Sequence, residues 1–385
     1  MRIAFVRKAY TPYGGAEQYL SQLMKRLGSM GHEVHVFAYR WEADQPGQTR
    51  EGKEAPIFHR VPVISSPSFL EALTFARSAR RLLEREEFDV IHSFERALYQ
   101  DIYRAGDGCH REWLIRRRRL DPWIKRNTYA LNPLHRTLLY LEKRTFHSPR
   151  LKKVIANSRR GKAEIIQHYR VPPEKIEVVY NGVDTENFHP GNIIQYRRSM
   201  REELKIPTET PVILFLGSGF RRKGLGALLD SIPLVKREVP QVILLVAGKD
   251  RFEEYRQRAQ RLGCERNVFF LGPTQRAREL YAASDLFALP TLYDPFSNAC
   301  LEAMATGIPV LTTSGNGVAE LIQDRKNGFI VQDPMSAGEI GQGVLDFFFS
   351  PGKGAMGEGA RQTALSLDLN VILNRMVQIY EAFRK

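Results

Sequence analysis

Residues 285–307 read DLFALPTLYDPFSNACLEAMATG, and this stretch combines a strand pattern, a polar turn and a helix start. The apolar run at 285–290 predicts a strand that leaves a packed sheet, and 303–307 predicts a helix closed by a C-terminal glycine. Between them, Asp294 and Glu302 place two carboxylates around the start of the helix. In an open α/β sheet, ligands bind outside the carboxyl ends of the strands, so the stretch predicts a ligand site.

The predicted helix start suits two kinds of ligand group. Its free backbone N–H groups and the positive end of its dipole favour a phosphate. A carboxylate does not hold phosphate, but Asp294 and Glu302 can accept hydrogen bonds from the hydroxyls of a sugar or a ribose.

Length and composition indicate a globular protein of two domains. The chain has 385 residues, of which 43% are hydrophobic and 26% are charged. No apolar run is long enough for a spanning helix, and the apolar part of the N-terminus is too short for a signal peptide. The three cysteines lie far apart and form neither a disulfide framework nor a metal-ligand pattern, so the expected compartment is a reducing cytoplasm.

The chain carries a net charge of +14 at pH 7. Such an excess of basic residues predicts anionic partners, which include nucleic acid, a membrane surface and phosphorylated substrates.

The first half of the chain alternates between strand and helix patterns. Residues 3–6 and 33–39 predict strands, and 16–27 predict a helix with one apolar face. Gly14 and Gly15 precede this helix, so the backbone can approach a ligand in front of the helix N-terminus. Their spacing is not the dinucleotide-binding Gly-x-Gly-x-x-Gly pattern, which argues against an NAD enzyme, and a plain turn is the alternative.

Asp107 is a second candidate in this half. It follows a predicted strand at 101–106, and an acidic residue at a strand end can face a reacting sugar. Aspartate is also a favoured turn residue through its own chemistry. The residues alone therefore leave a functional and a structural interpretation open.

The second half repeats the α/β pattern after an Asn-Gly turn signal at 181–182, and the domain boundary is expected within 180–195. Continuous apolar runs at 212–216 and 242–247 predict buried parallel strands. Strands that alternate with helical patterns predict an α/β fold with a doubly wound parallel sheet. Shorter strands are expected at 268–271, 285–289, 309–312 and 329–331.

The first strand of this half ends in the sequence Gly-Ser-Gly-Phe-Arg-Arg-Lys-Gly at 217–224. Arg222 and Lys223 lie at a strand end beside flexible glycines, which predicts a clamp for a diphosphate. The pattern is not a Walker motif, because no Ser or Thr follows Lys223. An exposed basic turn is the alternative.

The stretch 111–126 is unusual in composition. It contains seven basic residues against two acidic ones, together with two of the three tryptophans of the chain. This mixture suits an anionic membrane interface, a nucleic-acid backbone with stacking aromatics, or a solvated basic helix face. We favour a membrane or a lipid-linked acceptor. The basic patch consists of Arg111, Trp113, Arg116, Arg117, Arg118, Arg119, Trp123, Lys125 and Arg126.

Taken together, the motifs resemble those of the family 4 glycosyltransferases, which have the GT-B fold. The resemblance covers essentially the whole chain, and within the family it points to the lipopolysaccharide core glucosyltransferases. It is carried by the sequences at 14–17, 181–184, 222–224, 307–310 and 315–320, by Phe188 and Pro190, and by the pair Asp294 and Glu302. The sequences at 41–44, 101–107 and 217–224 carry the match to the subgroup.

The resemblance implies two Rossmann-like doubly wound parallel-sheet domains that face each other across a cleft. The acceptor-side domain would cover 1–185, the nucleotide-sugar domain would cover 186–368, and a C-terminal helix at 369–385 would pack back onto the first domain. Such enzymes transfer a hexose from a UDP-sugar with retention of configuration and need neither a metal nor a cofactor. The implied location is the cytoplasmic face of the inner membrane, and the implied partners are the sugar donor, a lipopolysaccharide core acceptor and the anionic membrane surface.

The resemblance also implies a role for each site residue. Glu302 would hold the ribose hydroxyls, and Asp294 would contact the donor sugar. Asp107 would contact the sugar from the first domain. The catalytic group is then Asp107, Asp294 and Lys223, and the donor-binding group is Gly14, Gly15, Arg222, Lys223, Phe296, Ser297, Asn298 and Glu302.

Two departures from the family pattern stand out. Asp294 occupies a position where the family usually has Glu, so its side chain is shorter by one methylene. Ser218 stands where many relatives have Arg, which removes one phosphate ligand, although the glucosyltransferase subgroup shares this serine.

Three alternatives to a lipopolysaccharide core glucosyltransferase remain. One is a related glycosyltransferase with another donor sugar or another lipid or polysaccharide acceptor. Another is a basic protein that binds a membrane or nucleic acid through an α/β scaffold, with nucleic acid the less favoured partner. The last is a nucleotide-sugar epimerase with two similar domains.

Overall fold

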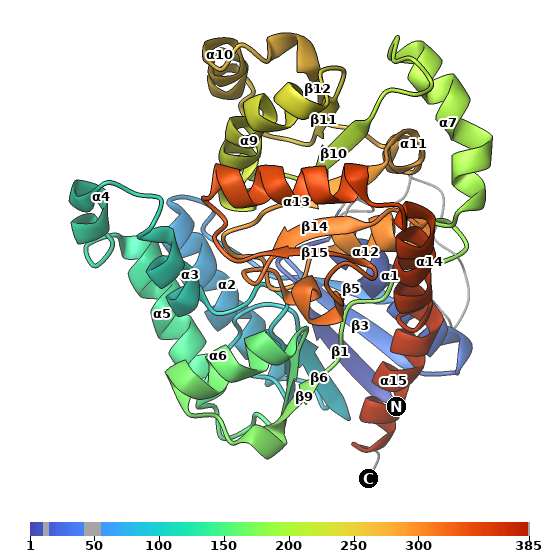
Figure 1. Ribbon diagram of the computed structural model, residues 1–385. Coiled ribbons are helices and arrows are strands. Elements are labelled where there is room, and N and C mark those ends of the chain that lie inside the picture. Colours follow the sequence, from blue (N-terminus) through green and yellow to red (C-terminus); the bar gives the residue numbers. More distant parts are fainter. Residues whose placement is uncertain (11–14, 42–54, 384–385) are drawn as a thin grey trace. The chain divides into compact units, whose positions relative to one another are not determined.

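The protein is described by a computed structural model that covers residues 1–10, 15–41 and 55–383 (Figure 1). The chain divides into two compact units. Unit 1 contains Met1–Gly182 and Asn370–Lys385, and unit 2 contains Val183–Leu369. The boundary expected from the sequence was after residue 185, a few residues further along the chain.

Unit 1 is built on a parallel sheet whose strand order reverses at its first strand. Within the described residues this sheet has seven strands in the order β5-β3-β1-β6-β7-β8-β9. The turning point lies between β1 and β6, which pair in parallel. The strands are β1 (Arg2–Val6), β3 (Glu33–Ala38), β5 (Ile57–Arg60), β6 (Val90–Ser93), β7 (Ile102–Arg104), β8 (Lys153–Ala156) and β9 (Ile176–Val178), and a separate pair is formed by β2 (Ala9–Tyr10) and β4 (Arg40–Trp41).

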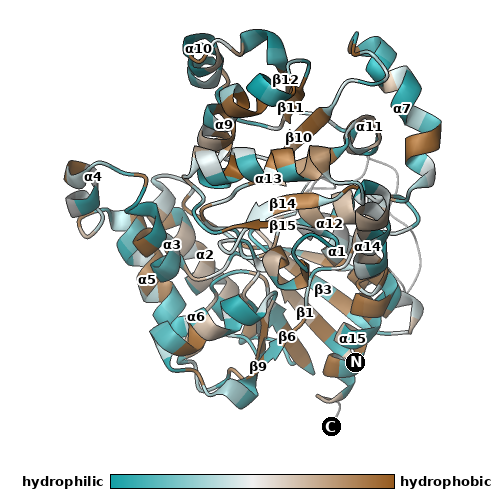
Figure 2. Cartoon of the chain, in the orientation of Figure 1, coloured by the Kyte–Doolittle hydropathy of each residue, from teal (hydrophilic) through white to brown (hydrophobic). Residues whose placement is uncertain are grey.

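The central strands of unit 1 are apolar because helices cover both faces of the sheet. Ile3, Ala4, Phe5 and Val6 are all fully buried, as expected for a parallel strand with no solvent-facing side. Figure 2 shows the same apolar character along β1 and β3. The helices are α1 (Gly15–Ser29), α2 (Ser68–Leu83), α3 (His110–Arg117), α4 (Trp123–Thr128), α5 (Pro133–Phe146), α6 (Arg159–Tyr169) and α15 (Leu369–Glu381), with a short 3-10 turn at Pro173–Lys175.

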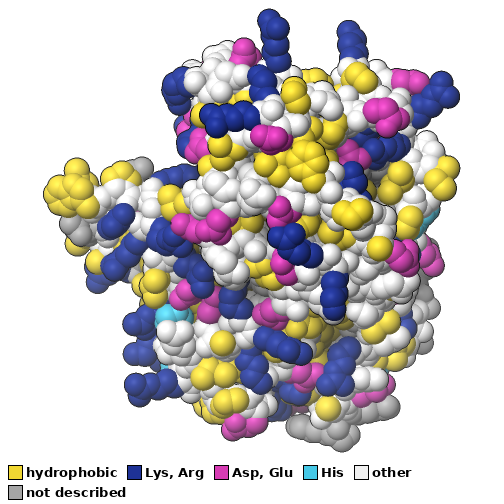
Figure 3. Space-filling view, in the orientation of Figure 1, with side chains coloured by type: hydrophobic (Ala, Val, Ile, Leu, Met, Phe, Trp, Pro, Cys, Tyr) yellow, Lys and Arg dark blue, Asp and Glu magenta, His cyan; other side chains and the backbone are white. Residues whose placement is uncertain are grey.

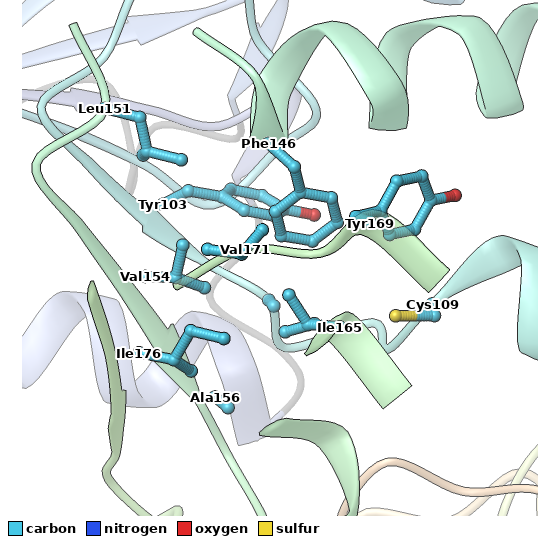
Figure 4. Packing of buried hydrophobic residues seen from close by; sticks show 11 residues of the cluster. Tyr103, Cys109, Phe146, Leu151, Val154, Ala156, Ile165, Tyr169, Val171 and Ile176 are labelled. Carbon is cyan, nitrogen blue, oxygen red and sulfur yellow. The ribbon is translucent and has the colours of Figure 1, made fainter. Parts of the chain in front are cut away.

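One face of the unit 1 sheet packs against α5 and α6. Tyr103 of β7 and Val154 of β8 point to this face and meet Phe146, Ile165 and Tyr169 from the two helices (Figure 4). Ser158 caps α6, since its hydroxyl accepts a hydrogen bond from the Gly161 N–H at 2.9 Å.

The other face of this sheet carries α15. Tyr380 of α15 is fully buried, and its hydroxyl lies 2.5 Å from His92 Nδ1 of β6. Its ring packs on Phe5 with 6.3 Å between ring centroids. Burial lowers the pKa of His92 well below its usual value, so this histidine stays neutral. The last helix of the chain is therefore part of the core of unit 1.

Unit 2 contains a second parallel sheet with the same kind of reversal. Among the described residues it has six strands in the order β12-β11-β10-β13-β14-β15, and the turning point lies between β10 and β13. The strands are β10 (Val212–Leu216), β11 (Ile243–Ala247), β12 (Val268–Gly272), β13 (Leu286–Leu289), β14 (Val310–Thr313) and β15 (Gly328–Val331), each within a residue or two of its predicted position. The doubly wound parallel architecture is confirmed in both units.

Helices cover both faces of the unit 2 sheet. The helix α9 packs against α13, while α11 packs against α7 and α12 packs against α14. The helices are α7 (Gly191–Glu203), α8 (Phe220–Lys223), α9 (Leu225–Glu238), α10 (Glu253–Arg261), α11 (Ala277–Ala283), α12 (Asn298–Thr306), α13 (Ala337–Phe349) and α14 (Lys353–Leu365), with 3-10 turns at Glu265–Asn267 and Gly317–Leu321.

The two ends of unit 2 are hydrogen-bonded to each other. The Val183 N–H donates to the Leu367 carbonyl at 3.0 Å, and the Leu369 N–H donates to the Val183 carbonyl at 2.8 Å. Thr185 Oγ1 adds a hydrogen bond to the Asp368 carboxylate at 2.5 Å. The chain therefore enters and leaves unit 2 through one paired strip.

A buried carboxylate organises the region around Asp107. Glu142 of α5 is fully buried and accepts a hydrogen bond from Arg96 Nε at 3.1 Å. It also accepts from the N–H groups of His110 and Arg111, at 2.8 and 3.3 Å, and from the Tyr169 hydroxyl. Glu142 thus caps the start of α3 and holds Arg96, whose Nη2 reaches the Gly108 carbonyl at 3.1 Å.

We expect Glu142→Ala to lower the free energy of unfolding by about 3–5 kcal/mol, because the substitution leaves a buried guanidinium and two helix-start amides without their acceptor. Urea denaturation followed by circular dichroism measures the change. The matched control is Glu84→Ala, which removes the exposed Arg80–Glu84 pair and should change stability by less than about 0.5 kcal/mol. Equal effects from the two substitutions would show that Glu142 is not the organising group.

Candidate functional site

The predicted site residues of unit 2 gather at the turning point of its sheet. The segments that follow β10 and β13 meet there, outside the carboxyl ends of the two strands. The first segment supplies Arg222 and Lys223 on α8, and the second supplies Asp294 ahead of α12. In doubly wound sheets this is where ligands bind.

A buried phenylalanine fixes the position of α8. Phe220 is fully buried, and its ring packs edge-on against Phe215, Phe252 and Tyr255 with centroid distances of 5.2–5.5 Å. Its N–H donates to Asp250 Oδ2 at 2.6 Å. The short helix is thereby held at the end of β10, and the same turn presents the two basic side chains.

Two glycines allow this turn to approach its neighbours closely. Gly224 has φ of +84°, and a Cβ there would lie 2.0 Å from the Pro290 carbonyl oxygen at the end of β13. A Cβ on Gly217 would lie 2.9 Å from Lys223 Nζ. Only glycine fits at position 224, because any side chain there would push the clamp away from the second segment, while a side chain at position 217 would displace the end of Lys223.

Asp294 lies between the two cations. Arg222 Nη1 and Lys223 Nζ are each 3.4 Å from Asp294 Oδ2. Arg222 also donates to the Tyr293 carbonyl at 2.7 Å, so its guanidinium is tied to the backbone of the same segment. The Asp294 side chain is only 9% exposed, and that of Lys223 is 12% exposed. The three side chains therefore form one cluster at the strand ends.

Glu302 is held by a buried tyrosine on a neighbouring helix. It lies on α12, which begins after Ser297 and ends at Gly307, where φ is +85° as the predicted glycine cap requires. The Tyr281 hydroxyl of α11 donates to Glu302 Oε2 at 2.9 Å. Burial raises the pKa of the Glu302 carboxyl, and the hydrogen bond from Tyr281 acts in the opposite direction.

Asn316 is a residue of the site whose role the sequence did not reveal. The Asn316 side chain belongs to the glycine loop at 315–317, where it points into the protein and is 1% exposed. Its Oδ1 accepts from the N–H groups of Ser297 and Val318, both at 3.2 Å. Its Nδ2 donates to Thr312 Oγ1 at 3.1 Å. Asn316 therefore connects the start of α12 to the end of β14.

The remaining predicted donor residues line the start of α12. Phe296 and Ser297 are buried, with 5% and 3% of their surface exposed, and Asn298 is the half-buried first residue of the helix. Cys300, one turn further, is fully buried, and burial raises the pKa of its thiol to about 12. This cysteine is therefore a neutral packing group and not a nucleophile.

Of the catalytic and donor-binding residues predicted in unit 1, only Gly15 and Asp107 lie within the described residues. Gly14 lies outside the described residues, and Gly15 is the first residue of α1. Asp107 is exposed in the turn that follows β7. The Glu95 carboxylate, which the sequence analysis did not single out, lies after β6, where it is 3.6 Å from Arg7 Nη1 and accepts from the Lys8 N–H at 3.2 Å.

The basic patch is divided between two helices. Asp121 lies between the two helices and is 1% exposed. Its carboxylate accepts hydrogen bonds from Arg117 Nε at 2.8 Å and from the Tyr129 hydroxyl. Beyond it, α4 presents Trp123 and Ile124, which are 70% and 61% exposed. Figure 3 shows apolar side chains at the tip of α4 with basic side chains behind them. The Lys125 side chain lies outside the described part of the structure.

Unit 2 also contains a cavity. Its volume is about 410 Å³, and it lies at the amino ends of β10, β13 and β14, which is the edge of the sheet opposite the Asp294 cluster.

Over residues 1–10, 15–41 and 55–383, no set of three or more His, Cys, Asp or Glu side chains is arranged to hold a metal ion. In the same ranges, no helix has both the length and the apolar composition of a membrane-spanning segment.

The fold and the site define a glycosyltransferase. The profile described as Glycosyltransferase Family 4 matches residues 13–187, and the profile described as Glycosyl transferases group 1 matches residues 197–361. The chain belongs to the family 4 glycosyltransferases with the GT-B fold, as the sequence motifs indicated.

Particular relatives extend this assignment. The chain is similar to the lipopolysaccharide glucosyltransferase WaaG of Escherichia coli, with 26% identity over 96% of each chain. It is also 26% identical to a D-inositol 3-phosphate glycosyltransferase of Corynebacterium kroppenstedtii, over 97% of this chain and 86% of the relative. A crystal structure of WaaG matches with a TM-score of 0.83 and 25% identity, covering 98% of this chain and 99% of that one. Anabaena HepE in complex with UDP and glucose shares the fold, with a TM-score of 0.72 and 22% identity over 98% and 99% of the two chains.

We expect Asn316→Ala to destabilise the protein by about 1–3 kcal/mol, because two buried N–H groups lose their acceptor. Thermal denaturation followed by circular dichroism checks this. Gln323→Ala, at an exposed position of the same unit, is the control and should leave the midpoint unchanged. A variant at position 316 as stable as this control would mean that the side chain does not hold the start of α12.

Proposed function

We propose that the protein is a retaining glucosyltransferase that transfers glucose from UDP-glucose to a heptose of the lipopolysaccharide core. The observation that carries the proposal is the cluster of Arg222, Lys223 and Asp294 beside the start of α12. The similarity to WaaG over 96% of the chain supports the choice of donor and acceptor.

The proposed roles follow from the charges that the reaction creates. Breaking the bond between the anomeric carbon and the phosphate oxygen leaves positive charge on the sugar and negative charge on the diphosphate. Arg222, Lys223 and the N–H groups at the start of α12 would stabilise the diphosphate from fixed positions, without a metal ion or a cofactor. The acceptor hydroxyl would attack on the face that the diphosphate leaves, which retains the anomeric configuration.

The carboxylates would orient the donor. Glu302 would accept hydrogen bonds from the ribose hydroxyls, since its Oε2 is already held by Tyr281. Asp294 would contact the donor sugar, and its ion pairs with Arg222 and Lys223 would keep both cations in place before the donor arrives. Asp107 in unit 1 would contact the sugar or its acceptor.

A second candidate is a family 4 glycosyltransferase with another donor sugar or another acceptor. The similarity to the D-inositol 3-phosphate glycosyltransferase favours this candidate, because it has the same identity as the similarity to WaaG and extends over 97% of the chain. A screen of UDP-sugars against core oligosaccharides and inositol phosphate distinguishes the two.

We expect UDP release from UDP-glucose in the presence of a core oligosaccharide acceptor, and we expect Lys223→Ala to lower kcat by about 10²–10³-fold, because it removes a preorganised cation from the leaving group. A coupled assay for UDP measures both. Lys236→Ala is the matched control and should leave kcat unchanged, since this lysine lies in the last turn of α9 and donates to the Gly263 carbonyl. Activity of Lys223→Ala within a few-fold of the unchanged protein would refute the clamp, and UDP release without an acceptor would indicate another reaction.

We further propose that the protein works at the cytoplasmic face of the inner membrane and that the basic patch holds it there. Each basic residue near an anionic surface contributes about 1 kcal/mol, and Trp123 and Ile124 can insert into the interface from the tip of α4. Such a patch would bring the enzyme to a lipid-linked acceptor.

We expect binding to vesicles that contain anionic lipid, weakened at high salt, and we expect the double substitution Trp123→Ala and Ile124→Ala to weaken it by about tenfold or more, because the interface loses two inserted apolar groups. Co-sedimentation with vesicles checks this. Ile194→Ala on α7 is the control, since this residue is 90% exposed but lies outside the patch. Equal sedimentation with zwitterionic and anionic vesicles, or no sedimentation at low salt, would contradict the proposal.

A further inference from the structure

The segment Val183–Pro190 carries motif residues to which the proposed reaction assigns no role. It lies in unit 2 and folds into a turn around Asp184, whose Oδ1 accepts from the N–H groups of Glu186 and Asn187 at 3.2 and 2.9 Å. The Phe188 N–H donates to the Asp184 carbonyl at 2.9 Å. This turn places the Phe188 side chain against the helices of the donor unit.

Arg361 of α14 fastens this segment to the end of α12. Its Nη1 donates to the carbonyls of Phe188 and Ala305, at 2.9 and 2.8 Å, and its Nη2 donates to the Thr185 carbonyl at 3.3 Å. Ala305 lies in the last turn of α12, where a cation also interacts favourably with the helix dipole. The segment and the helix that carries Glu302 are therefore held by one guanidinium.

The Phe188 ring in turn holds Tyr281. The two rings meet edge-on with 5.9 Å between centroids and an interplanar angle of 79°, and Phe287 of β13 lies 5.7 Å from Tyr281 on another side. Tyr281 is fully buried, so it cannot reach a ligand itself. Its hydroxyl lies 2.9 Å from Glu302 Oε2 and 3.0 Å from the Ala299 carbonyl oxygen. The single hydroxyl proton is within reach of both acceptors, and an ionised carboxylate is the stronger one, so the tyrosine presents a fixed donor to Glu302 on the next helix.

A donor fixed in this way has two effects on Glu302. It selects one rotamer of a side chain that is otherwise free to turn, and it stabilises the ionised carboxylate more than the neutral acid. Burial raises the pKa of Glu302, and a charged carboxylate is the better acceptor for two hydroxyl groups, so this hydrogen bond counteracts the cost of burial.

We propose that Tyr281 is a positioning residue for the donor nucleotide: its hydroxyl holds Glu302 in the orientation that accepts the ribose hydroxyls, and the Val183–Pro190 segment holds the Tyr281 ring through Phe188. This inference rests on the proposed function of Glu302. It links the segment where the chain enters unit 2 to the group that recognises the nucleotide.

The test is the affinity for UDP, measured by calorimetry as a function of pH. Tyr281→Phe keeps the ring and removes only the hydroxyl, and we expect it to weaken UDP binding by about tenfold near neutral pH. Without the hydrogen bond the pKa of Glu302 rises further, so affinity should fall at a higher pH than in the unchanged protein as the solution is acidified. Tyr103→Phe, at a buried tyrosine in the core of unit 1, is the control and should change neither property.

A double-mutant cycle separates positioning from a general loss of packing. If Tyr281 acts through Glu302, then Tyr281→Phe should have no further effect on UDP affinity when Glu302→Gln is already present. The fall in affinity on acidification, here called the acid limb, should be absent in both proteins that carry Gln. Equal weakening by Tyr281→Phe in both backgrounds would overturn the proposal.

The remaining outcomes are distinguishable. If the unchanged protein binds no UDP, or Glu302→Gln binds it normally, the proposed function of Glu302 fails. If Glu302→Gln weakens binding but Tyr281→Phe does not, only the inference about Tyr281 fails. If Tyr281→Phe does not fold, Phe188→Leu takes its place. Its looser contact with the Tyr281 ring should also move the acid limb to higher pH, and an unchanged limb would overturn the proposal.

Discussion

A charged side chain that leaves water must find a partner, and this constraint organises both units of the protein. In unit 2, Asp294 is nearly buried and is matched by Arg222 and Lys223. In unit 1, Glu142 is fully buried and is matched by Arg96 and by the first amides of α3. Each carboxylate costs free energy to bury and becomes destabilising when its partners are removed. Both buried carboxylates lie at the carboxyl side of their sheet, beside the residues proposed to act on substrate.

The architecture could be predicted because its signals are local. Buried parallel strands require continuous apolar runs, and runs such as Val212–Leu216 are found where the sequence places them. The helix end at Gly307 and the cap at Ser158 depend on single residues with specific backbone chemistry. Arg222, Lys223 and Asp294 were each predicted at a strand end, and the pairing of β10 with β13 brings these two strand ends together. The helix α7 was not predicted, since its polar sequence shows no apolar stripe of sufficient length.

The supporting contacts of the site could not be predicted because they depend on tertiary packing. Asn316 resembles any loop asparagine in the sequence, yet its side chain joins the start of α12 to β14. Tyr281 lies twenty-one positions before Glu302, and only the packing of α11 beside α12 brings its hydroxyl to the carboxylate. The basic patch was read as one stretch, but the buried Asp121 divides it into two helices, which leaves Trp123 and Ile124 on the exposed tip of the second.

The paired strip at Val183 and Leu369 has a mechanical consequence. The chain passes between the two units twice, and the two passages are hydrogen-bonded to each other. Neither passage can therefore be displaced without straining the hydrogen bonds that hold the other. Because Thr185 and Phe188 follow directly on one side of the strip, a substitution in the strip lies within a few residues of the contacts that support Glu302.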